Sequence, residues 1–239
     1  MRIIRLAWPQ KADPAATGEI FLSPAQARHG VQVLRLAAGS LVEMVGPAGL
    51  APARVTTSSG KGGHHRLGIM LIGPWLRSEA ATGPRLALSL ISGPRFDWAV
   101  EKAVELGASA LIPLICARTK AGDARPGPAR ESRWRRLAEE ARKQCGRASE
   151  MEISPVMEFG QLLALSGPGF FLNPAAGEDS PLAVNSPLLS VGPEGGFSPA
   201  EEKAFLEAGF RPWRLGSTVL RAETAALAAL AVLNAATTA

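Results

Sequence analysis

From residue 86 onward, short apolar runs alternate with longer segments that have helical spacing. The runs LALSLI, ALIPLI and GFFLNP have the length of buried strands, whereas RFDWAVEKAVELGA places apolar residues three and four positions apart. Strands that alternate with helices predict an α/β domain on a largely parallel sheet, because parallel neighbours need a crossover connection. With 239 residues, of which 46% are hydrophobic and 20% charged, the chain can bury such a core.

The first 75 residues have a different pattern of short strands and turns. The segment GSLVEMVGPAGLAPARVTT alternates and breaks at Gly46-Pro47, which predicts a β-hairpin. The segment Ser23–Leu36 predicts a helix, with Ser23 as its N-cap and a proline in the first helical position. The predicted division is a small, mostly β domain (1–75), a linker (76–85) and the α/β domain (86–239).

The positive charge of the chain is concentrated in two regions. The formal net charge is +5, and residues 118–147 carry ten basic against four acidic side chains. Residues 1–75 also have a basic excess, whereas residues 148–239 are acidic. Separate basic regions indicate a polyanionic partner such as nucleic acid. The alternative is that the arginines only make a surface more soluble.

Several kinds of site and partner are not expected. Two cysteines, Cys116 and Cys145, are too few for a disulfide framework or a zinc site, so no metal is expected. The start MRIIRLAWPQ has no long apolar core, so it does not predict a signal peptide. The longest apolar run, AALAALAVL, is too short to span a bilayer, and we expect a cytoplasmic protein with no membrane partner.

The segment GPEGGFSPAEEKAFLEAGF places a glycine-rich loop between a strand and a helix. Ser198 is a good N-cap and Glu201 completes a capping box, so the helix begins directly after the loop. The loop lacks both the lysine of a P-loop and the G-x-G-x-x-G pattern, and Glu194 would repel a phosphate. We therefore expect a neutral or cationic ligand held by backbone groups, with a plain tight turn as the alternative.

Two further strand ends resemble this one. The run FFLNPAAG enters a turn at Asn173, and RLGSTVLRAETAA enters a polar run before an apolar helix. Three strand ends of one parallel sheet can line one pocket, because ligands of such sheets bind at the carboxyl ends of the strands. In the last run, Arg221 is either a structural partner of Glu223 or a cation that contacts the substrate.

The loop GPEGGFSPAE, followed by LGSTVLRAETAALAAL, resembles the RsmE family of 16S ribosomal RNA uridine N3-methyltransferases. Upstream, DWAVEKAVELGASALIPL, RWRRLAEEARKQCGR and ARHGVQVLRLAAGSLVEM extend the resemblance in order over nearly the whole chain. The resemblance implies a C-terminal SPOUT-type methyltransferase domain, a parallel-sheet domain with a trefoil knot, and a small N-terminal PUA-like β-barrel that helps to bind RNA. It also implies a homodimer.

The implied activity is methylation of N3 of a uridine by S-adenosylmethionine, with 16S ribosomal RNA or the small ribosomal subunit as partner. Two alternatives stay open: methylation of a ribose 2′-oxygen or guanine N1, and a non-catalytic RNA-binding protein of ribosome assembly. The resemblance and the loop chemistry together give the expected cofactor-binding residues: Leu172, Asn173, Gly192, Glu194, Gly195, Gly196, Leu215, Gly216, Ser217, Leu220 and Thr224.

The reaction needs a uracil N3 that has lost its proton, and a cation near the base carbonyls would favour that anion. Arg221 is the first candidate for this catalytic cation and Arg147 the second. No general base is evident, and Glu194 and Glu223 are the candidates. The predicted RNA contacts are Arg2, Arg5, Arg28, Arg35, Lys61 and Arg95.

The sequence departs from the family pattern at two basic positions. GPRFDW stands where Lys-Gly-Asp-Lys is expected, so Arg95 is interpreted as the substitute for a basic group there. ASEM follows Arg147 where Asn-Arg is expected, which removes a basic group.

Overall fold

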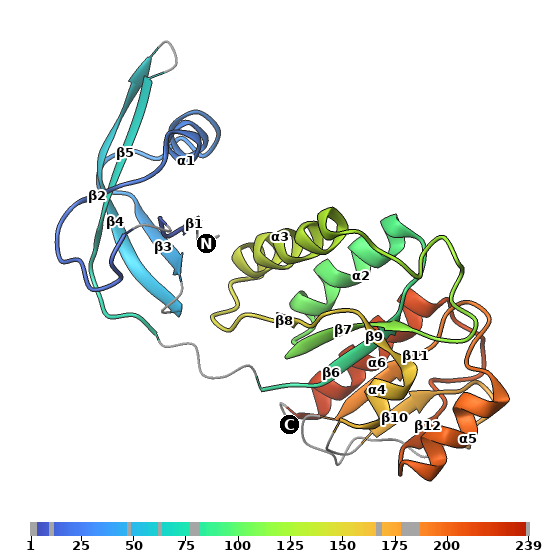
Figure 1. Cartoon of the computed structure of the whole chain (residues 1–239). Helices are drawn as coiled ribbons and strands as arrows, with labels where there is room; N and C mark the ends of the chain where they lie inside the picture. The colour runs from blue at the N-terminus through green and yellow to red at the C-terminus, as the bar shows by residue number, and fades with distance from the viewer. Residues whose placement is uncertain are drawn as a thin grey trace. The chain divides into compact units, whose positions relative to one another are not determined.

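The computed structural model describes residues 4–9, 12–46, 49–61, 64–76, 82–165, 169–177 and 187–237 (Figure 1). Two compact units are present: Met1–Ala80 with Arg142–Ser149, and Ala81–Ala141 with Glu150–Ala239. Of the predicted RNA contacts, Arg2 and the side chain of Lys61 lie outside the described residues.

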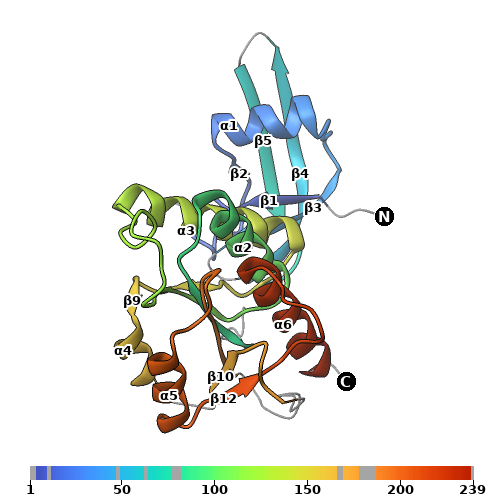
Figure 2. The same cartoon turned by 90° about the vertical axis from the view of Figure 1, so that its right-hand side faces the viewer.

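The first unit is built on a five-stranded sheet in the order β1-β3-β4-β5-β2. Its strands are β1 (Arg5–Ala7), β2 (Ile20–Phe21), β3 (Leu41–Gly46), β4 (Gly49–Lys61) and β5 (His64–Leu71). β3 and β4 form the predicted hairpin, with Gly46 paired to Gly49. In Figure 2, β4 and β5 form a long hairpin with the helical segment beside it. Among the described residues, no pairing joins β1 to β2, so this sheet does not close on itself there.

The predicted helix of the first unit is shorter than expected. α1 (Pro24–Arg28) begins with the expected capping box, in which the Ser23 side chain accepts from the backbone of Gln26. The chain then continues as a π-helical segment, η1 (His29–Val33). Arg35, directly after this segment, has a positive φ of 52°, so the helical path ends there.

The second unit contains a seven-stranded sheet whose described pairings are all parallel, which confirms the predicted parallel α/β domain. Its order is β12-β10-β11-β6-β7-β8, and β9 also pairs with β7. The strands are β6 (Arg85–Ser89), β7 (Ala110–Ile115), β8 (Glu152–Ile153), β9 (Met157–Glu158), β10 (Gly169–Leu172), β11 (Leu188–Val191) and β12 (Arg211–Trp213).

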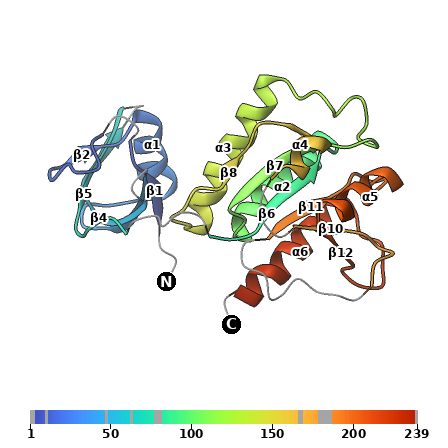
Figure 3. The ribbon, with the colours of Figure 1, turned by 60° about the horizontal axis from the view of Figure 1, so that its bottom comes forward.

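Five helices accompany this sheet: α2 (Gly93–Glu105), α3 (Pro128–Cys145), α4 (Phe159–Leu163), α5 (Pro199–Glu207) and α6 (Ala222–Thr237). α2 packs against α6, whereas α4 packs against α5 and β7 (Figure 3). The α4 and α5 side encloses a phenylalanine-rich core, in which the rings of Phe171 and Phe205 stack at 4.8 Å. α6 is buried along one face only, and Val232 on another face is exposed.

The order of the strands decides where the loops lie. β12, β10, β11, β6 and β7 are consecutive neighbours and run parallel, so their carboxyl ends lie along the same edge of the sheet. We call this the carboxyl edge. The three predicted ligand loops follow β10, β11 and β12 and therefore lie at this edge, together with the loops after β6 and β7.

Candidate functional site

The loop Gly192–Phe197 follows β11 and ends at the first residues of α5. Ser198 caps α5 as predicted, in a capping box with Glu201. The loop turns through Gly196, whose φ is +68°, a conformation that favours glycine. A Cβ atom at Gly192 would lie 3.1 Å from the backbone carbon of Gly196, so the loop closes tightly on itself. The turn itself therefore favours glycine at positions 192 and 196.

Glu201 is a structural residue of this loop. Its carboxylate is buried and accepts from the backbone N–H of Ser198 at 2.7 Å. It also accepts from the N–H of Ala117, after β7, at 2.7 Å. Its charge therefore stabilises two backbone donors.

Arg118, in the loop after β7, makes hydrogen bonds to the backbone of the Gly192–Phe197 loop. One guanidinium nitrogen of Arg118 donates to the carbonyl of Gly195 at 2.6 Å and to that of Phe197 at 3.1 Å. The next residue, Thr119, accepts from the N–H of Cys116 at 2.8 Å and lies 3.0 Å from the Ser89 hydroxyl. Sequence reasoning missed Arg118, although it lies in the basic region that begins at residue 118.

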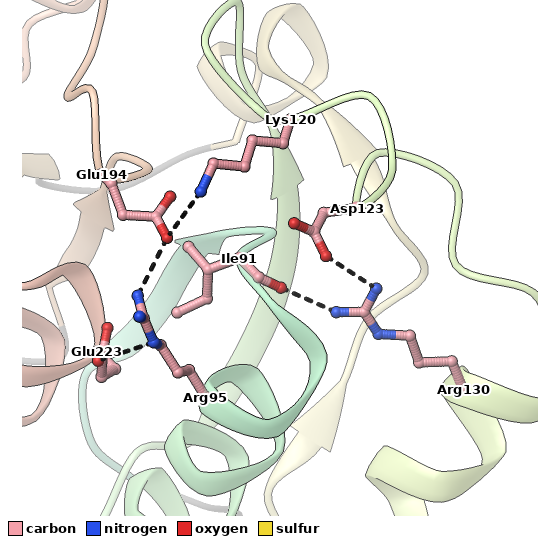
Figure 4. Close-up of polar contacts among 7 residues, drawn as sticks. All are labelled: Ile91, Arg95, Lys120, Asp123, Arg130, Glu194 and Glu223. Carbon is pink, nitrogen blue, oxygen red and sulfur yellow. Dashed lines mark hydrogen bonds and ion pairs between the residues drawn. The ribbon is translucent and has the colours of Figure 1, made fainter.

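Glu194 is the centre of a charge network at the carboxyl edge (Figure 4). Its Oε1 lies 3.2 Å from the guanidinium of Arg95, in the first turn of α2, and 3.5 Å from Nζ of Lys120, in the loop after β7. Arg95 also reaches Glu223, in the first turn of α6, with 3.8 Å between Nε and Oε1. Segments that follow β6, β7, β11 and β12 are thus joined by side-chain charges.

Glu223 differs from Glu194 in its burial and in its ion pairs. The Glu223 side chain is 9% exposed, and its Oε2 is buried with no hydrogen-bond partner among the described residues. Its ion pair is with Arg95, not with Arg221, so the interpretation of Arg221 as the structural partner of Glu223 is wrong. Arg221 is exposed and makes no ion pair with another described residue.

The remaining predicted cofactor residues lie in the loops after β10 and β12. Asn173 joins these strands, because its N–H donates to the carbonyl of Trp213 at 3.0 Å. Its side chain accepts from the N–H of Ala175 at 2.8 Å, so it shapes its own turn. The residues at this edge that are half-buried or exposed are Leu172, Leu215, Gly216, Ser217, Leu220 and Thr224.

Arg147 belongs to the first unit, unlike the catalytic candidates Arg221, Glu194 and Glu223, which belong to the second. Its guanidinium donates to the hydroxyl of Ser149 at 2.9 Å, and burial lowers the pKa of its side chain. In the same unit, Arg5 pairs with Glu43 at 2.7 Å, whereas Arg28 and Arg35 are exposed. Arg95 lies instead within the charge network of the second unit.

The described part of the chain also shows what its metal-ligating side chains, its buried cysteine and its helices can do. No group of three or more His, Cys, Asp or Glu side chains there could hold a metal ion. Burial raises the pKa of the Cys116 thiol to about 12, so this cysteine stays protonated at neutral pH. None of the described helices has the length and apolarity needed to cross a membrane.

Comparison with known proteins now identifies the class. Residues 80–234 match the family described as RNA methyltransferase domain, and the chain belongs to that class. Within it, the chain is a member of the RsmE family, whose proteins are named ribosomal RNA small subunit methyltransferase E.

The relatives define how far this similarity reaches. The chain is 32% identical over 171 residues to the Synechocystis protein of that name and 32% identical over 165 residues to that of Bacillus subtilis. The matches cover 52% and 64% of the length of these relatives. The structure of the Neisseria gonorrhoeae protein of that name, bound to S-adenosyl methionine, is 26% identical, with a TM-score of 0.78 over 98% of each chain.

Proposed function

We propose that this protein transfers a methyl group from S-adenosylmethionine to N3 of a uridine in small-subunit ribosomal RNA. The observation that carries the proposal is the adjacency of the loops after β10, β11 and β12 at one edge of a parallel sheet. One of them is a glycine loop that is held in place without a phosphate-binding lysine of its own. The relatives' name and the bound cofactor of the Neisseria protein support it.

The residues at this edge fit S-adenosylmethionine. The cofactor has no phosphate, and the edge offers a backbone turn at Gly195 and Gly196 in a loop that has no phosphate-binding lysine of its own. No side chain stands beyond the Cα atom of Gly196, where an added Cβ would meet nothing within 4 Å. Backbone groups of this loop and of the loops at Leu172 and Leu215 would hold the cofactor.

The cofactor, when bound, supplies a methyl carbon made electrophilic by its sulfonium sulfur. The protein must hold the uracil so that N3 faces that carbon, and must favour the form of N3 that has lost its proton. Arg221 is exposed at the start of α6, and we assign to it the stabilisation of the negative charge on the base. Arg147 remains the second candidate for that role.

The RNA would be bound by both basic regions. In the described part of the first unit, Arg28 and Arg35 present exposed guanidinium groups, which are suited to phosphate contacts. A base in a paired region must leave its partner before N3 can react, so RNA contacts also position the extruded base.

Three features of architecture are part of the proposal: a trefoil knot in the second unit, a PUA-like barrel in the first, and a homodimer. The knot is supported by the strand order, since β12 lies beyond β10 while α6 returns to pack against α2. The dimer is supported by α6, which leaves Val232 exposed.

Calorimetric titration and nucleoside analysis test the activity together. We expect heat with S-adenosylmethionine and none with ATP, and then 3-methyluridine in digests of small-subunit ribosomal RNA after incubation with both. Binding of ATP alone would contradict the cofactor assignment. A 2′-O-methylated nucleoside or 1-methylguanosine would contradict N3 of uridine as the methylated position. A protein that binds RNA but does not bind S-adenosylmethionine would instead be interpreted as an assembly protein.

A further inference from the structure

We propose that Glu194 occupies, within the protein itself, the place of an RNA phosphate. Arg95 and Lys120 form a binding site for one phosphodiester of the substrate strand, and the Glu194 carboxylate fills this site until RNA binds. The inference rests on the proposed function, because it takes RNA as the substrate.

The first argument is the geometry around one oxygen atom. Oε1 of Glu194 lies 3.2 Å from Arg95 and 3.5 Å from Lys120, which come from different segments of the chain (Figure 4). A single anionic oxygen between a guanidinium and an ammonium is the arrangement that a phosphate oxygen adopts in nucleic-acid complexes. A carboxylate in this position therefore imitates that oxygen in charge and in contacts.

The second argument is that the contact is weak enough to be exchanged. The Lys120 side chain is 66% exposed, that of Arg95 39% and that of Glu194 29%. Ion pairs of such exposure contribute roughly 0–1 kcal/mol each, so an incoming phosphodiester of the same charge can displace the carboxylate.

The third argument concerns what stays in place after Glu194 moves. Arg95 keeps its second partner, the buried Glu223, so its guanidinium remains oriented toward the loop. Arg118 donates to loop carbonyls, and Arg130 is engaged by Asp123 and the Ile91 carbonyl. Arg95 and Lys120 differ from Arg118 and Arg130 in this respect, because the partner that they share is a partly exposed acid.

The test measures binding of the full-length protein to purified, protein-free small-subunit ribosomal RNA at several salt concentrations. We expect Glu194→Gln to tighten binding about three- to tenfold, because two cations lose an internal competitor. The dependence of the logarithm of affinity on the logarithm of salt concentration should stay nearly the same, because RNA makes the same phosphate contact in both proteins once Glu194 has moved aside.

Two further variants make the result specific. Glu207→Gln is the matched control, because Glu207 is 67% exposed, pairs with Lys203 in α5 and has the same charge to lose. We expect it to change RNA affinity by less than about twofold. Lys120→Gln should weaken RNA binding, and Glu194→Gln should gain less in that background, because only Arg95 is then released.

The possible results separate this inference from the proposed function. Glu194→Gln that binds RNA no more tightly than Glu207→Gln would overturn the inference while leaving the proposed function intact. A variant that gains affinity for S-adenosylmethionine but not for RNA would also overturn it, since the site would then take the cofactor carboxylate. If the parent protein and every variant bind neither this RNA nor intact small ribosomal subunits, the proposed function itself would be overturned.

Discussion

Two of the three loops predicted to hold the cofactor have opposite surroundings in the structure. The loop Gly192–Phe197 is held by Arg118 through its carbonyls and by Glu201 through the start of α5. The loop 214–221, between β12 and α6, has exposed residues from Gly216 to Val219. Its Val219 side chain is 82% exposed.

This difference indicates a division of labour between the loops. A loop whose backbone is fixed before binding loses little conformational freedom when it meets a ligand, and can set the ligand's position. An exposed loop has fewer contacts to give up when it rearranges on binding, and a charged group at its end can then contact the substrate. We therefore assign binding to Gly192–Phe197 and the response to substrate to the loop that ends at Arg221.

The largest effect should come from Arg221→Ala. We expect the rate of methyl transfer to fall by about 10²–10³, the usual loss when one group that stabilises developing negative charge is removed. The free energy of unfolding should stay unchanged, because the side chain is exposed without an ion pair among the described residues. Single-turnover transfer of a labelled methyl group and urea unfolding measure the two quantities.

Arg211→Ala serves as the control for this variant, since Arg211 is also exposed but lies over the ring of Phe170. It should keep the rate of transfer. A fall in rate equal to that of Arg221→Ala would show that any lost positive charge weakens RNA binding, and the loop would lose its assigned role.

The next largest effect tests the fixed loop. Glu201→Ala removes a buried carboxylate that accepts from the backbone of Ala117 and Ser198. We expect the free energy of unfolding to fall by about 2–4 kcal/mol, because buried donors lose a charged partner. Ser198→Ala, which removes one capping bond, should cost about 1 kcal/mol in the same urea experiment. Equal losses for the two variants would mean that the link to Ala117 contributes nothing.

A smaller effect is expected when the fixed loop is loosened without removal of its cap. Arg118→Ala deletes the bonds to the carbonyls of Gly195 and Phe197. We expect the affinity for S-adenosylmethionine to fall about three- to tenfold and stability by about 1 kcal/mol. Calorimetry with Arg125→Ala as the control, an exposed arginine of the same loop, tests this. Unchanged affinity would show that the loop keeps its shape without Arg118.

Much of the fold could be predicted because its signals are local. The parallel sheet of the second unit follows from apolar runs of strand length separated by helical spacing, and the start of α5 follows from Ser198 and Glu201. β8, β9 and α4 were not predicted, because strands of two residues and a helix of five carry too few positions for a period to show.

The candidate site was predictable only in part, for a related reason. The loops were found from their glycines and polar residues, but the contacts that fix them join residues far apart in sequence. Arg95 lies 99 residues from Glu194, and Arg118 lies 77 residues from Gly195. No pattern along the chain encodes such pairs, because the crossed strand order decides which loops are neighbours. This is also why Arg221 was considered as a partner of Glu223.

The smallest effect is expected from Val219→Ser, and it tests the exposure of the loop 214–221 in solution. Full burial of a valine contributes roughly 1.5–3 kcal/mol, so a buried Val219 would reveal itself in stability. We expect the free energy of unfolding to change by less than about 0.5 kcal/mol, as at other surface positions. Urea unfolding at two protein concentrations measures this, because a loss confined to the higher concentration would place Val219 in a contact between copies of the chain. The loop would then be ordered by a second copy before substrate binds, and its contrast with Gly192–Phe197 would disappear.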